Sequence, residues 1–348
     1  MEPNNKKLIA LICGGNSYEH TVSLDSAYDI IKYAKNLSQY EYILIGIPKE
    51  KNKKWKYENG TYYNFFFKKS GGKLKLNPKS KEIFQIGQGK INDRKIYKAF
   101  LTTHGSRGED GTIQGFLTLN EIPYLGCKIY QSAICFNKRL CKDLINSINI
   151  STVEYKFISK EDNIDTKIIE INKKFLSNTI VKINDGGSSI GCYVSSKNNL
   201  KNNILKALNL SDEILIEEYI QMREICIGIL KKDNKYLISI PGEFKINKNK
   251  GLIFDYQQKY SYDEESHYLQ VPAILETDIC SKIKNYALKI FKYLNLNDYA
   301  RLDFFLTPDN KIYFNEINTL PGFTHSSSFP LLFKDKFTFI ELLEFLFN

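Results

Sequence analysis

The stretch YARLDFFLTPDNKIYFNEIN, residues 299–318, decides how the C-terminal part of this chain folds. Two runs typical of β-strands, residues 301–306 and 311–317, flank a turn over residues 307–310 that contains Pro and Asn. Strand-like runs separated by a short polar turn predict a β-hairpin.

Side chains alternate between the two faces of a strand. Arg301 and Asp303 therefore share one face of the first strand, while Glu316 and Asn318 share one face of the second. Two carboxylates and an amide oxygen gathered on one face suit Mg²⁺, which prefers hard oxygen ligands. An ordinary amphipathic hairpin with its charged face in water would show the same alternation.

A tight loop with Pro and Gly, residues 319–324, follows the hairpin and leads into Ser326, Ser327 and Ser328. Serine hydroxyls and backbone N–H groups in such a loop can bind a carboxylate. The sequence therefore predicts an anion site beside the metal site.

The string Arg301-x-Asp303, followed by Glu316-x-Asn318-Thr319-x-Pro321-Gly322, closely resembles the C-terminal signature of D-alanine–D-alanine ligases, which belong to the ATP-grasp superfamily. The resemblance implies ligation of two D-alanines to D-alanyl-D-alanine through a D-alanyl phosphate, with release of ADP and phosphate, for peptidoglycan precursor synthesis. It further implies ATP and D-alanine as small-molecule partners, Mg²⁺ or Mn²⁺ as two bound ions, and a homodimer, the common state in the family.

Composition favours a globular cytoplasmic protein with no membrane or nucleic-acid partner. The chain has 348 residues, 43% of them hydrophobic and 25% charged, and its net charge of +10 comes from scattered Lys residues rather than from a basic stripe. Its seven cysteines form no CxxC pair, which indicates reduced thiols. Neither a signal peptide nor an apolar run of membrane-spanning length is visible.

Residues 7–13 form a short apolar run, followed by Gly14-Gly15 and a helix pattern over residues 22–35, which together predict the start of a doubly wound α/β domain. Glu19 near the helix start could be a cap or a ligand. The segment matches the family's GGxSxEhxVS, in which the glutamate binds the ammonium group of the first D-alanine.

A second strand over residues 97–102 ends in polar residues, at the edge where parallel sheets bind ligands. His104 could be an ordinary structural histidine. The family's HGxxGEDGxxQG is matched in full, however, at His104, Gly105, Gly108, Glu109, Asp110, Gly111, Gln114 and Gly115. The resemblance makes His104 a substrate-binding residue.

Two lysines and a Gly-Ser loop predict a phosphate site in the middle of the chain. Lys138 begins a helix over residues 139–148, and Asn137 replaces the family's usual Asp before it. Lys182 lies in a β run that precedes the loop Gly187-Ser188-Ser189 and a second β run. Small residues expose backbone N–H groups to phosphates, although a plain hairpin turn has the same composition. The resemblance assigns both lysines and the loop to ATP.

An acidic β run and a later loop complete the resemblance. Glu217, Glu218 and Tyr219 match the family's adenine hinge and Glu224 its ribose contact. Residues 254–260 resemble the mobile loop YDYxxKY, in which Lys259 contacts the γ-phosphate or acyl phosphate. Tyr260 is expected to hydrogen-bond Ser188 and Glu19, and it favours the dipeptide-forming branch over the one that makes D-alanyl-D-lactate.

The expected fold is α/β: a three-domain ATP-grasp with an N-terminal doubly wound α/β domain and ATP held between two β-rich domains. The expected domains are residues 1–126 for the substrate domain, with a β insertion at about 50–98, 127–217 for the lid, and 218–348 for the catalytic domain. Helices are predicted over residues 276–294 and 336–347.

The resemblance also assigns the chemistry. Asp303, Glu316 and Asn318 would hold the metal, and Arg301 with the Gly322 amide would stabilise the oxyanion of the tetrahedral intermediate. Lys259, Ser327 and the amide of Ser328 would bind the carboxylate of the second D-alanine. The catalytic residues would be Glu19, Ser188, Tyr260 and Arg301.

Three other functions stay open at this point: a ligase that uses D-lactate or D-serine, a nucleotide-binding protein without ligase chemistry, and a protein whose basic charge binds nucleic acid.

Overall fold

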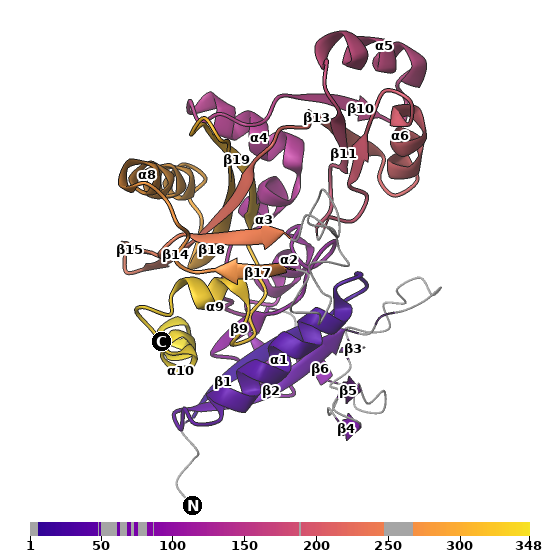
Figure 1. The fold of residues 1–348 in the computed structure, drawn as a ribbon. Helices are drawn as coiled ribbons and strands as arrows, with labels where there is room; N and C mark the ends of the chain where they lie inside the picture. The colour runs from indigo at the N-terminus through magenta and orange to yellow at the C-terminus, as the bar shows by residue number, and fades with distance from the viewer. Residues whose placement is uncertain are drawn as a thin grey trace, which may run out of the picture.

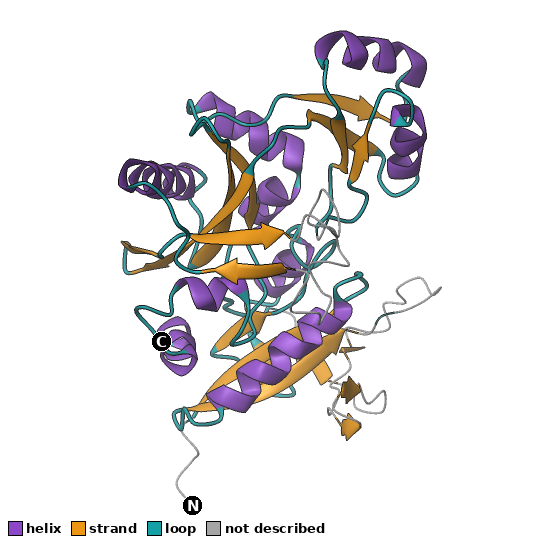
Figure 2. Cartoon of the chain, in the orientation of Figure 1, coloured by secondary structure: helices purple, strands orange, loops and turns teal. Residues whose placement is uncertain are grey.

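The computed structural model describes residues 6–47, 49, 61–62, 68–70, 73–75, 82–85, 87–187, 189–246 and 267–348. Figures 1 and 2 show three assemblies of sheet and helix, one from the N-terminal third, one from the middle of the chain and one from the C-terminal third. No helix among these residues is both long and apolar enough to cross a membrane. All seven cysteines are free thiols, as the sequence predicted.

The N-terminal assembly is built on a parallel sheet of order β2-β1-β9. Its elements are β1 (Lys7–Gly14), α1 (His20–Ala34), β2 (Tyr40–Ile47), β9 (Lys98–Leu101) and α2 (Thr112–Leu119). The apolar run of β1 is buried from its second residue onward, because it is the central strand. The predicted strand, glycine turn and helix are confirmed.

The insertion is β-rich where the structure describes it. It contains β3 (Thr61–Tyr62), β4 (Lys68–Ser70), β5 (Lys73–Lys75), β6 (Glu82–Gln85), β7 (Lys90–Ile91) and β8 (Arg94–Lys95). These short strands pair in the order β3-β6-β7-β8 and as a separate β4-β5 hairpin, without joining the parallel sheet. The β character expected for this segment is confirmed for the described residues.

The middle assembly is an antiparallel sheet of order β10-β13-β11-β12, called the lid sheet below. Its elements are β10 (Tyr155–Ser159), α5 (Ile164–Lys174), β11 (Thr179–Ile183), β12 (Tyr193–Ser195), α6 (Leu200–Leu208) and β13 (Glu213–Glu218). The lid sheet and helices α5 and α6 share a separate apolar core. Figure 1 shows the two helices beside the lid sheet. Strands β11 and β12 are the predicted antiparallel pair around the Gly-Ser loop.

The C-terminal sheet has the order β17-β16-β14-β18-β19, with β15 paired to β14. Its strands are β14 (Arg223–Lys232), β15 (Lys235–Ile238), β16 (Gly242–Ile246), β17 (His267–Gln270), β18 (Tyr299–Leu306) and β19 (Ile312–Asn318). The helices around it are α3 (Ile129–Phe136), α4 (Lys138–Ser147), α8 (Thr277–Tyr293), α9 (Ser328–Leu332) and α10 (Phe339–Phe347).

The two faces of β18 belong to different environments. Ala300, Leu302 and Phe304 lie in a core with residues of α3, α4 and α8, whereas Tyr299 lies in the core that contains the parallel sheet. Arg301 and Asp303 share the face of Tyr299 by alternation. The charged face of the hairpin therefore looks toward the N-terminal assembly. Helices α3 and α4 pack on the C-terminal sheet although they precede the lid sheet in sequence.

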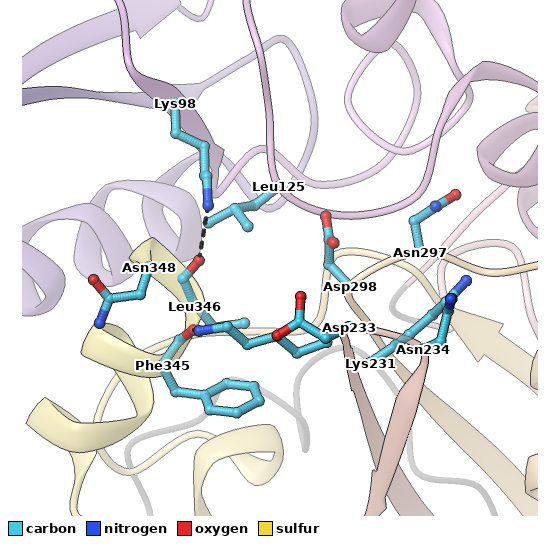
Figure 3. Close-up of a pocket in the computed structure, with 11 residues that line it drawn as sticks. Lys98, Leu125, Lys231, Asp233, Asn234, Asn297, Asp298, Phe345, Leu346 and Asn348 are labelled. Carbon is cyan, nitrogen blue, oxygen red and sulfur yellow. Dashed lines mark hydrogen bonds between the residues drawn. The ribbon is translucent and has the colours of Figure 1, made fainter.

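The last helix joins the N-terminal assembly to the C-terminal sheet. Lys98 of β9 donates hydrogen bonds to the Leu346 and Phe347 carbonyls at 3.4 and 3.1 Å, and Lys232 of β14 donates to the Phe345 carbonyl at 3.1 Å. Figure 3 shows the cavity of about 340 Å³ between these groups. Cations near the C-terminus of a helix satisfy its unpaired carbonyls, so these lysines stabilise α10.

Candidate functional site

The hairpin forms the predicted charged face. Arg301 lies opposite Asn318 and Asp303 opposite Glu316 in the β18–β19 register. The Arg301 guanidinium donates to both carboxylate oxygens of Asp303 at 2.8 Å, and Asn318 Nδ2 donates to Asp303 Oδ2 at 2.9 Å. A third guanidinium nitrogen donates to Ser328 Oγ at 3.0 Å. These bonds fix the guanidinium in one orientation at the end of the hairpin.

The donor set of this face fits a hard divalent cation. Asp303 and Glu316 are cross-strand neighbours, and Asn318 lies beside them. Among the residues that the structure describes, no three His, Cys, Asp or Glu side chains are grouped to hold a metal. Asp303, Glu316 and Asn318 offer two carboxylates and one amide. Such donors suit Mg²⁺, because that ion is usually held by one or two carboxylates together with substrate phosphates.

The serine loop is anchored to the N-terminal assembly. Thr324 N–H donates to Ser327 Oγ at 2.9 Å, which closes the loop that follows Gly322. The next residue, His325, donates its backbone N–H to the Asp29 carboxylate of α1 at 2.8 Å, and its ring Nδ1 lies 2.5 Å from the same oxygen. The loop with Gly322, Ser327 and Ser328 is thus held over α1 and beside Arg301.

Glu19 lies where three loops meet. It occupies the N-cap position of α1 but its side chain makes no capping hydrogen bond, and only 7% of it is exposed. A Cβ on Gly105 would lie 3.6 Å from Glu19 Oε2, and one on Gly187 would lie 3.4 Å from the same atom. The sequence left a cap and a ligand open for Glu19. Its side chain does not cap α1 in the structure, and its role as a ligand stays a prediction.

His104 and Glu109 add two titratable groups to this point. Burial lowers the pKa of His104, although the charge of Glu19 opposes the shift, and its Nε2 has no hydrogen-bond partner among the described residues. Burial and the charge of Glu19 raise the pKa of Glu109 to about 8, and its carboxylate accepts from Gly105 N–H at 2.7 Å. The sequence assigned no role to Glu109 beyond its place in the motif around His104.

The start of α4 is fixed against the Gly-Ser loop. Asn137 caps the helix by accepting from Leu140 N–H at 2.9 Å, so the replacement of the family's Asp keeps the cap. Lys138 N–H donates to the Asn184 carbonyl at 3.2 Å, and its ammonium donates to the Gly186 carbonyl. The structure therefore brings Lys138 next to the predicted phosphate loop.

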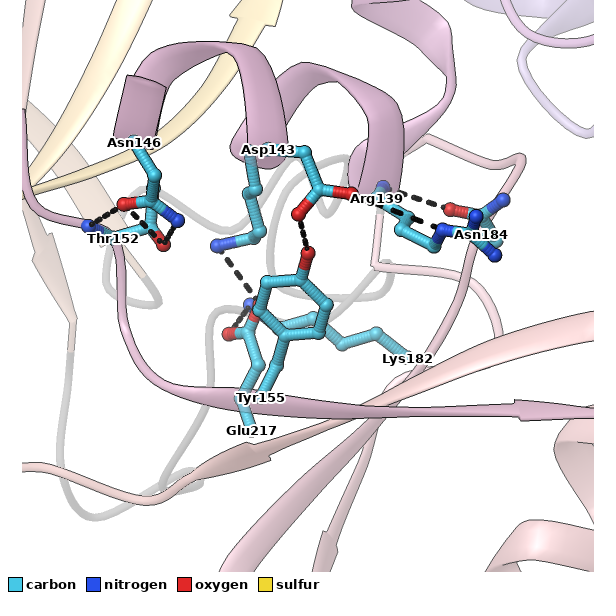
Figure 4. Close-up of polar contacts among 9 residues, drawn as sticks. Arg139, Asp143, Asn146, Thr152, Tyr155, Lys182, Asn184 and Glu217 are labelled. Atoms are coloured by element: carbon cyan, nitrogen blue, oxygen red, sulfur yellow. Dashed lines mark hydrogen bonds and ion pairs between the residues drawn. The ribbon is translucent and has the colours of Figure 1, made fainter. Parts of the chain in front are cut away.

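Lys182 of β11 and Glu217 of β13 are diagonal neighbours on two paired strands, and Figure 4 shows their side chains together. Lys182 Nζ lies 2.7 Å from Glu217 Oε2, and Lys142 Nζ of α4 lies 2.9 Å from Glu217 Oε1. Burial lowers the pKa of Lys182, but the charges of Glu217 and, more weakly, Glu316 raise it. Lys182 Nζ lies 5.5 Å from the centre of the Phe305 ring in β18, so this lysine lies near the hairpin.

The sequence reasoning missed Lys142. It lies four residues after Lys138 on one helix, a spacing that places two side chains on the same face. That spacing was the available signal, but nothing in the sequence pairs α4 with β13.

The remaining hinge residues lie at the edge of this region. Glu218 accepts a hydrogen bond from Ser177 Oγ at 3.2 Å. Tyr219 N–H donates to the Asn178 carbonyl at 2.9 Å. Glu224 is partly buried in β14 opposite Phe305. Their proposed contacts with adenine and ribose stay predictions.

Three predicted site residues, Ser188, Lys259 and Tyr260, lie outside the described residues. Ser189 follows the first of them and has a left-handed backbone with φ of 56°. The roles of all four stay predictions.

Two family models match the chain. The one described as "D-ala D-ala ligase N-terminus" matches residues 8–127, and the one described as "D-ala D-ala ligase C-terminus" matches residues 144–347. The second match alone covers more than half of the chain.

Curated relatives and solved structures agree with these matches. A D-alanine–D-alanine ligase of Acetivibrio thermocellus is 34% identical and covers 98% of this chain and 94% of its own length. One from Wigglesworthia glossinidia brevipalpis is 36% identical and covers 94% and 93%.

Among solved structures, D-alanyl-alanine synthetase A of Vibrio cholerae has a TM-score of 0.80 at 29% identity, covering 99% of this chain and 98% of its own. The D-Ala:D-Ser ligase VanG of Enterococcus faecalis has a TM-score of 0.81 at 27% identity, covering 99% and 100%. The predicted ATP-grasp fold is confirmed, and the chain belongs to the D-alanine–D-alanine ligase family.

Proposed function

We propose that this chain is the ATP-dependent ligase that joins two D-alanines for peptidoglycan precursor synthesis, with the site residues in the roles given below. One observation carries the proposal: the Arg301, Asp303, Glu316 and Asn318 face of the hairpin is assembled in register, and Lys182 Nζ lies 5.5 Å from the centre of the Phe305 ring of the same hairpin. An acidic metal face beside a phosphate-binding lysine is what phosphoryl transfer from ATP requires.

ATP would lie between the lid sheet and the C-terminal sheet. Lys138, Lys182 and Lys259 would offset phosphate charge, and backbone groups of Gly187, Ser188 and Ser189 would fold over the phosphates. The segment Glu217, Glu218 and Tyr219 would border adenine, with Glu224 at the ribose. Support comes from the position of Lys138 beside Gly186 and from that of Lys182 beside the Phe305 ring of β18.

Asp303, Glu316 and Asn318 would hold Mg²⁺ or Mn²⁺, and we propose two ions. A bound cation would neutralise charge on the transferred phosphoryl group.

The first D-alanine would be held by its ammonium group on Glu19. His104 supports this role because burial lowers its pKa and keeps the ring neutral beside the substrate, and its unpartnered Nε2 can bond one polar substrate atom. Ser188 and Tyr260 would link the Gly-Ser loop and the mobile loop to Glu19.

The reaction has two steps. A carboxylate oxygen of the first D-alanine attacks the γ-phosphorus, ADP leaves, and D-alanyl phosphate forms. The amine of the second D-alanine then attacks the acyl carbon, the bond to the phosphate oxygen breaks, and phosphate leaves with that oxygen.

Arg301 and the Gly322 amide would stabilise the tetrahedral oxyanion of the second step. Lys259, Ser327 and the Ser328 amide would hold the carboxylate of the second D-alanine. The bond from Arg301 to Ser328 supports this arrangement, because it places the guanidinium beside the proposed carboxylate site.

The acceptor amino acid is tested by its products. Phosphate release from ATP would be measured with D-alanine alone and with D-alanine plus D-serine or D-lactate, and the products identified by mass. Dialanine as the main product in every mixture supports the proposal. A mixed product in excess of dialanine would move the chain to the activity that the VanG structure is named for, or to its D-lactate counterpart.

We also propose a cytoplasmic homodimer and the division into domains at residues 126 and 217. The packing of α3 and α4 on the C-terminal sheet means that the first helices of the middle domain would move with that sheet when the lid opens.

A further inference from the structure

Lys142 is a buried lysine for which the proposed mechanism has no use. Only 1% of the Lys142 side chain is exposed. The side chain of its ion-pair partner, Glu217, is also 1% exposed. A lysine buried to this extent is costly unless its charge is matched. Glu217 matches it but also pairs with Lys182, so one carboxylate neutralises two ammonium groups.

The carboxylate at the centre of this cluster is strongly held. Burial would raise the pKa of Glu217, but the charges of Lys142 and Lys182 lower it to about 2. Glu217 is therefore ionised at neutral pH and shared between the two lysines. Burial lowers the pKa of Lys142, although the charge of Glu217 opposes the shift. Lys182, 13% exposed, is the most accessible member of the cluster of Lys142, Glu217 and Lys182.

Helix α4 connects the two sheets that would enclose ATP. Its apolar residues Cys141 and Ile145 pack in the core of the C-terminal sheet. Toward the lid sheet it makes three polar contacts: Asp143 accepts from the Tyr155 hydroxyl, the Arg139 guanidinium lies 4.3 Å from the centre of the Phe157 ring, and Lys142 pairs with Glu217.

Two of these contacts are partly exposed, with Arg139 and Asp143 side chains 39% and 56% accessible. Exposed polar contacts contribute little because water competes with them. Both side chains of the Lys142–Glu217 pair are only 1% exposed. The start of α4 is also tied to the lid by backbone N–H groups of Lys138 and Arg139, which donate to buried Asn184 at 3.2 and 3.0 Å. The same helix carries Lys138 one turn earlier.

Resting on the proposed function, we propose that Lys142 is a positioning residue of the phosphate site, which shares the Glu217 carboxylate with Lys182 and thereby positions the Lys182 ammonium. With Lys142 present, the Glu217 carboxylate is shared, so it does not fully neutralise Lys182. The Lys182 ammonium can then donate to a phosphate. Without Lys142, Glu217 pairs with Lys182 alone and holds that ammonium away from the nucleotide.

The test compares a nucleotide that has phosphates with one that lacks them. Binding of ADP with Mg²⁺ and of adenosine is measured by calorimetry for the wild type and for Lys142→Met, which keeps the side-chain length without the charge. We expect ADP to bind at least roughly tenfold more weakly, because one charge-assisted hydrogen bond to phosphate is lost. Adenosine should bind within about twofold of the wild type, well below the effect of one such bond.

A merely structural role would weaken both ligands alike, so an equal loss for ADP and adenosine overturns the proposal. Unchanged ADP binding does so as well. Lys160→Met is the matched control, because Lys160 forms an ion pair with Asp212 in the same assembly at 54% exposure. It should leave both affinities unchanged.

A second variant tests the same mechanism, and it takes the place of Lys142→Met if Lys142→Met does not fold. Lys142→Met/Glu217→Gln removes both charges, and replacing a buried pair by neutral groups is often tolerated. Because Glu217 would border adenine, the readout is the ratio of ADP affinity to adenosine affinity, in which a change at adenine cancels. This ratio should return to within about threefold of the wild-type ratio, because Lys182 is no longer captured. A double variant whose ratio stays as low as that of Lys142→Met overturns the proposal. Binding does not depend on ligation, so absence of D-alanine-dependent turnover would affect the proposed function alone.

Discussion

The hairpin face and the buried cluster of Lys142, Glu217 and Lys182 are both charged groups of the same proposed site, but they are built differently. The hairpin face joins residues within 18 positions of each other, through alternation on two paired strands. The buried cluster joins a helix to two strands, and Lys142 and Glu217 lie 75 positions apart. The first contacts substrate in our account, and the second positions a group that does.

The comparison indicates that a site can depend on charges that never touch a ligand. Exposure separates the two roles only in part, because Arg301 and Lys182 are both mostly buried, at 14% and 13% exposed. In our account, the two roles differ in whether the neighbours of a charged side chain already neutralise its charge. The predictions below test this distinction.

The largest effect is expected at Arg301. Arg301→Ala should lower turnover by roughly a hundredfold or more, because removal of an oxyanion donor costs about 3 kcal/mol in the barrier. Steady-state turnover with saturating ATP and D-alanine measures it. Lys311→Ala on the same hairpin is the control, since its pair with Asp309 is exposed. Wild-type turnover in Arg301→Ala would contradict the assignment.

The buried cluster should control stability in acid. The pKa of Glu217 is lowered from 4.5 to about 2 in the folded chain, so its contribution is complete above about pH 5 and is lost as pH falls toward 2. Between pH 6 and pH 3 the wild type should lose about 2 kcal/mol more unfolding free energy than Lys142→Met/Glu217→Gln. Urea unfolding at both pH values measures this difference, and parallel losses would show that Glu217 is not the titrating group.

The hairpin face should control the metal requirement. In Glu316→Gln, the Mg²⁺ concentration for half-maximal activity should rise at least tenfold, because a charged oxygen ligand is replaced by a neutral one. Lys142→Met should leave the Mg²⁺ requirement unchanged, since it lies outside the donor set. A Mg²⁺ titration at saturating ATP compares them, and an unchanged requirement in Glu316→Gln would remove this residue from the metal site.

The smallest effect is expected for the exposed pair at the hairpin turn. Lys311→Ala should change unfolding free energy by about 0.5 kcal/mol or less, because water and salt screen exposed ion pairs. Thermal unfolding measures the change. A loss above about 2 kcal/mol would show that the turn, and not only the strand pairing, determines the geometry of the charged face.

Local patterns account for what the sequence predicted well. The hairpin, the first strand and helix, and the pair β11–β12 follow from alternation, from apolar runs and from Gly-rich turns, each within a few residues. The last helix was expected from residue 336 but begins at Phe339. Thr338 and Glu341 form a capping box that fixes its start.

Contacts between distant segments account for what the sequence did not predict. The burial of Lys142 depends on how α4 lies between two sheets, and the raised pKa of Glu109 depends on its burial and on the charge of Glu19 from another loop. Neither arrangement leaves a pattern within a window of adjacent residues. The packing of α3 and α4 on the C-terminal sheet is of the same kind.

The most direct test of the central claim, ligation through D-alanyl phosphate, follows one oxygen atom. D-alanine labelled with ¹⁸O in its carboxylate is incubated with the protein, ATP and Mg²⁺, and the released phosphate is analysed by mass spectrometry. Our account predicts one ¹⁸O atom in each phosphate, dialanine as the product, and no release with L-alanine. Phosphate without ¹⁸O, or no release stimulated by D-alanine, would contradict it.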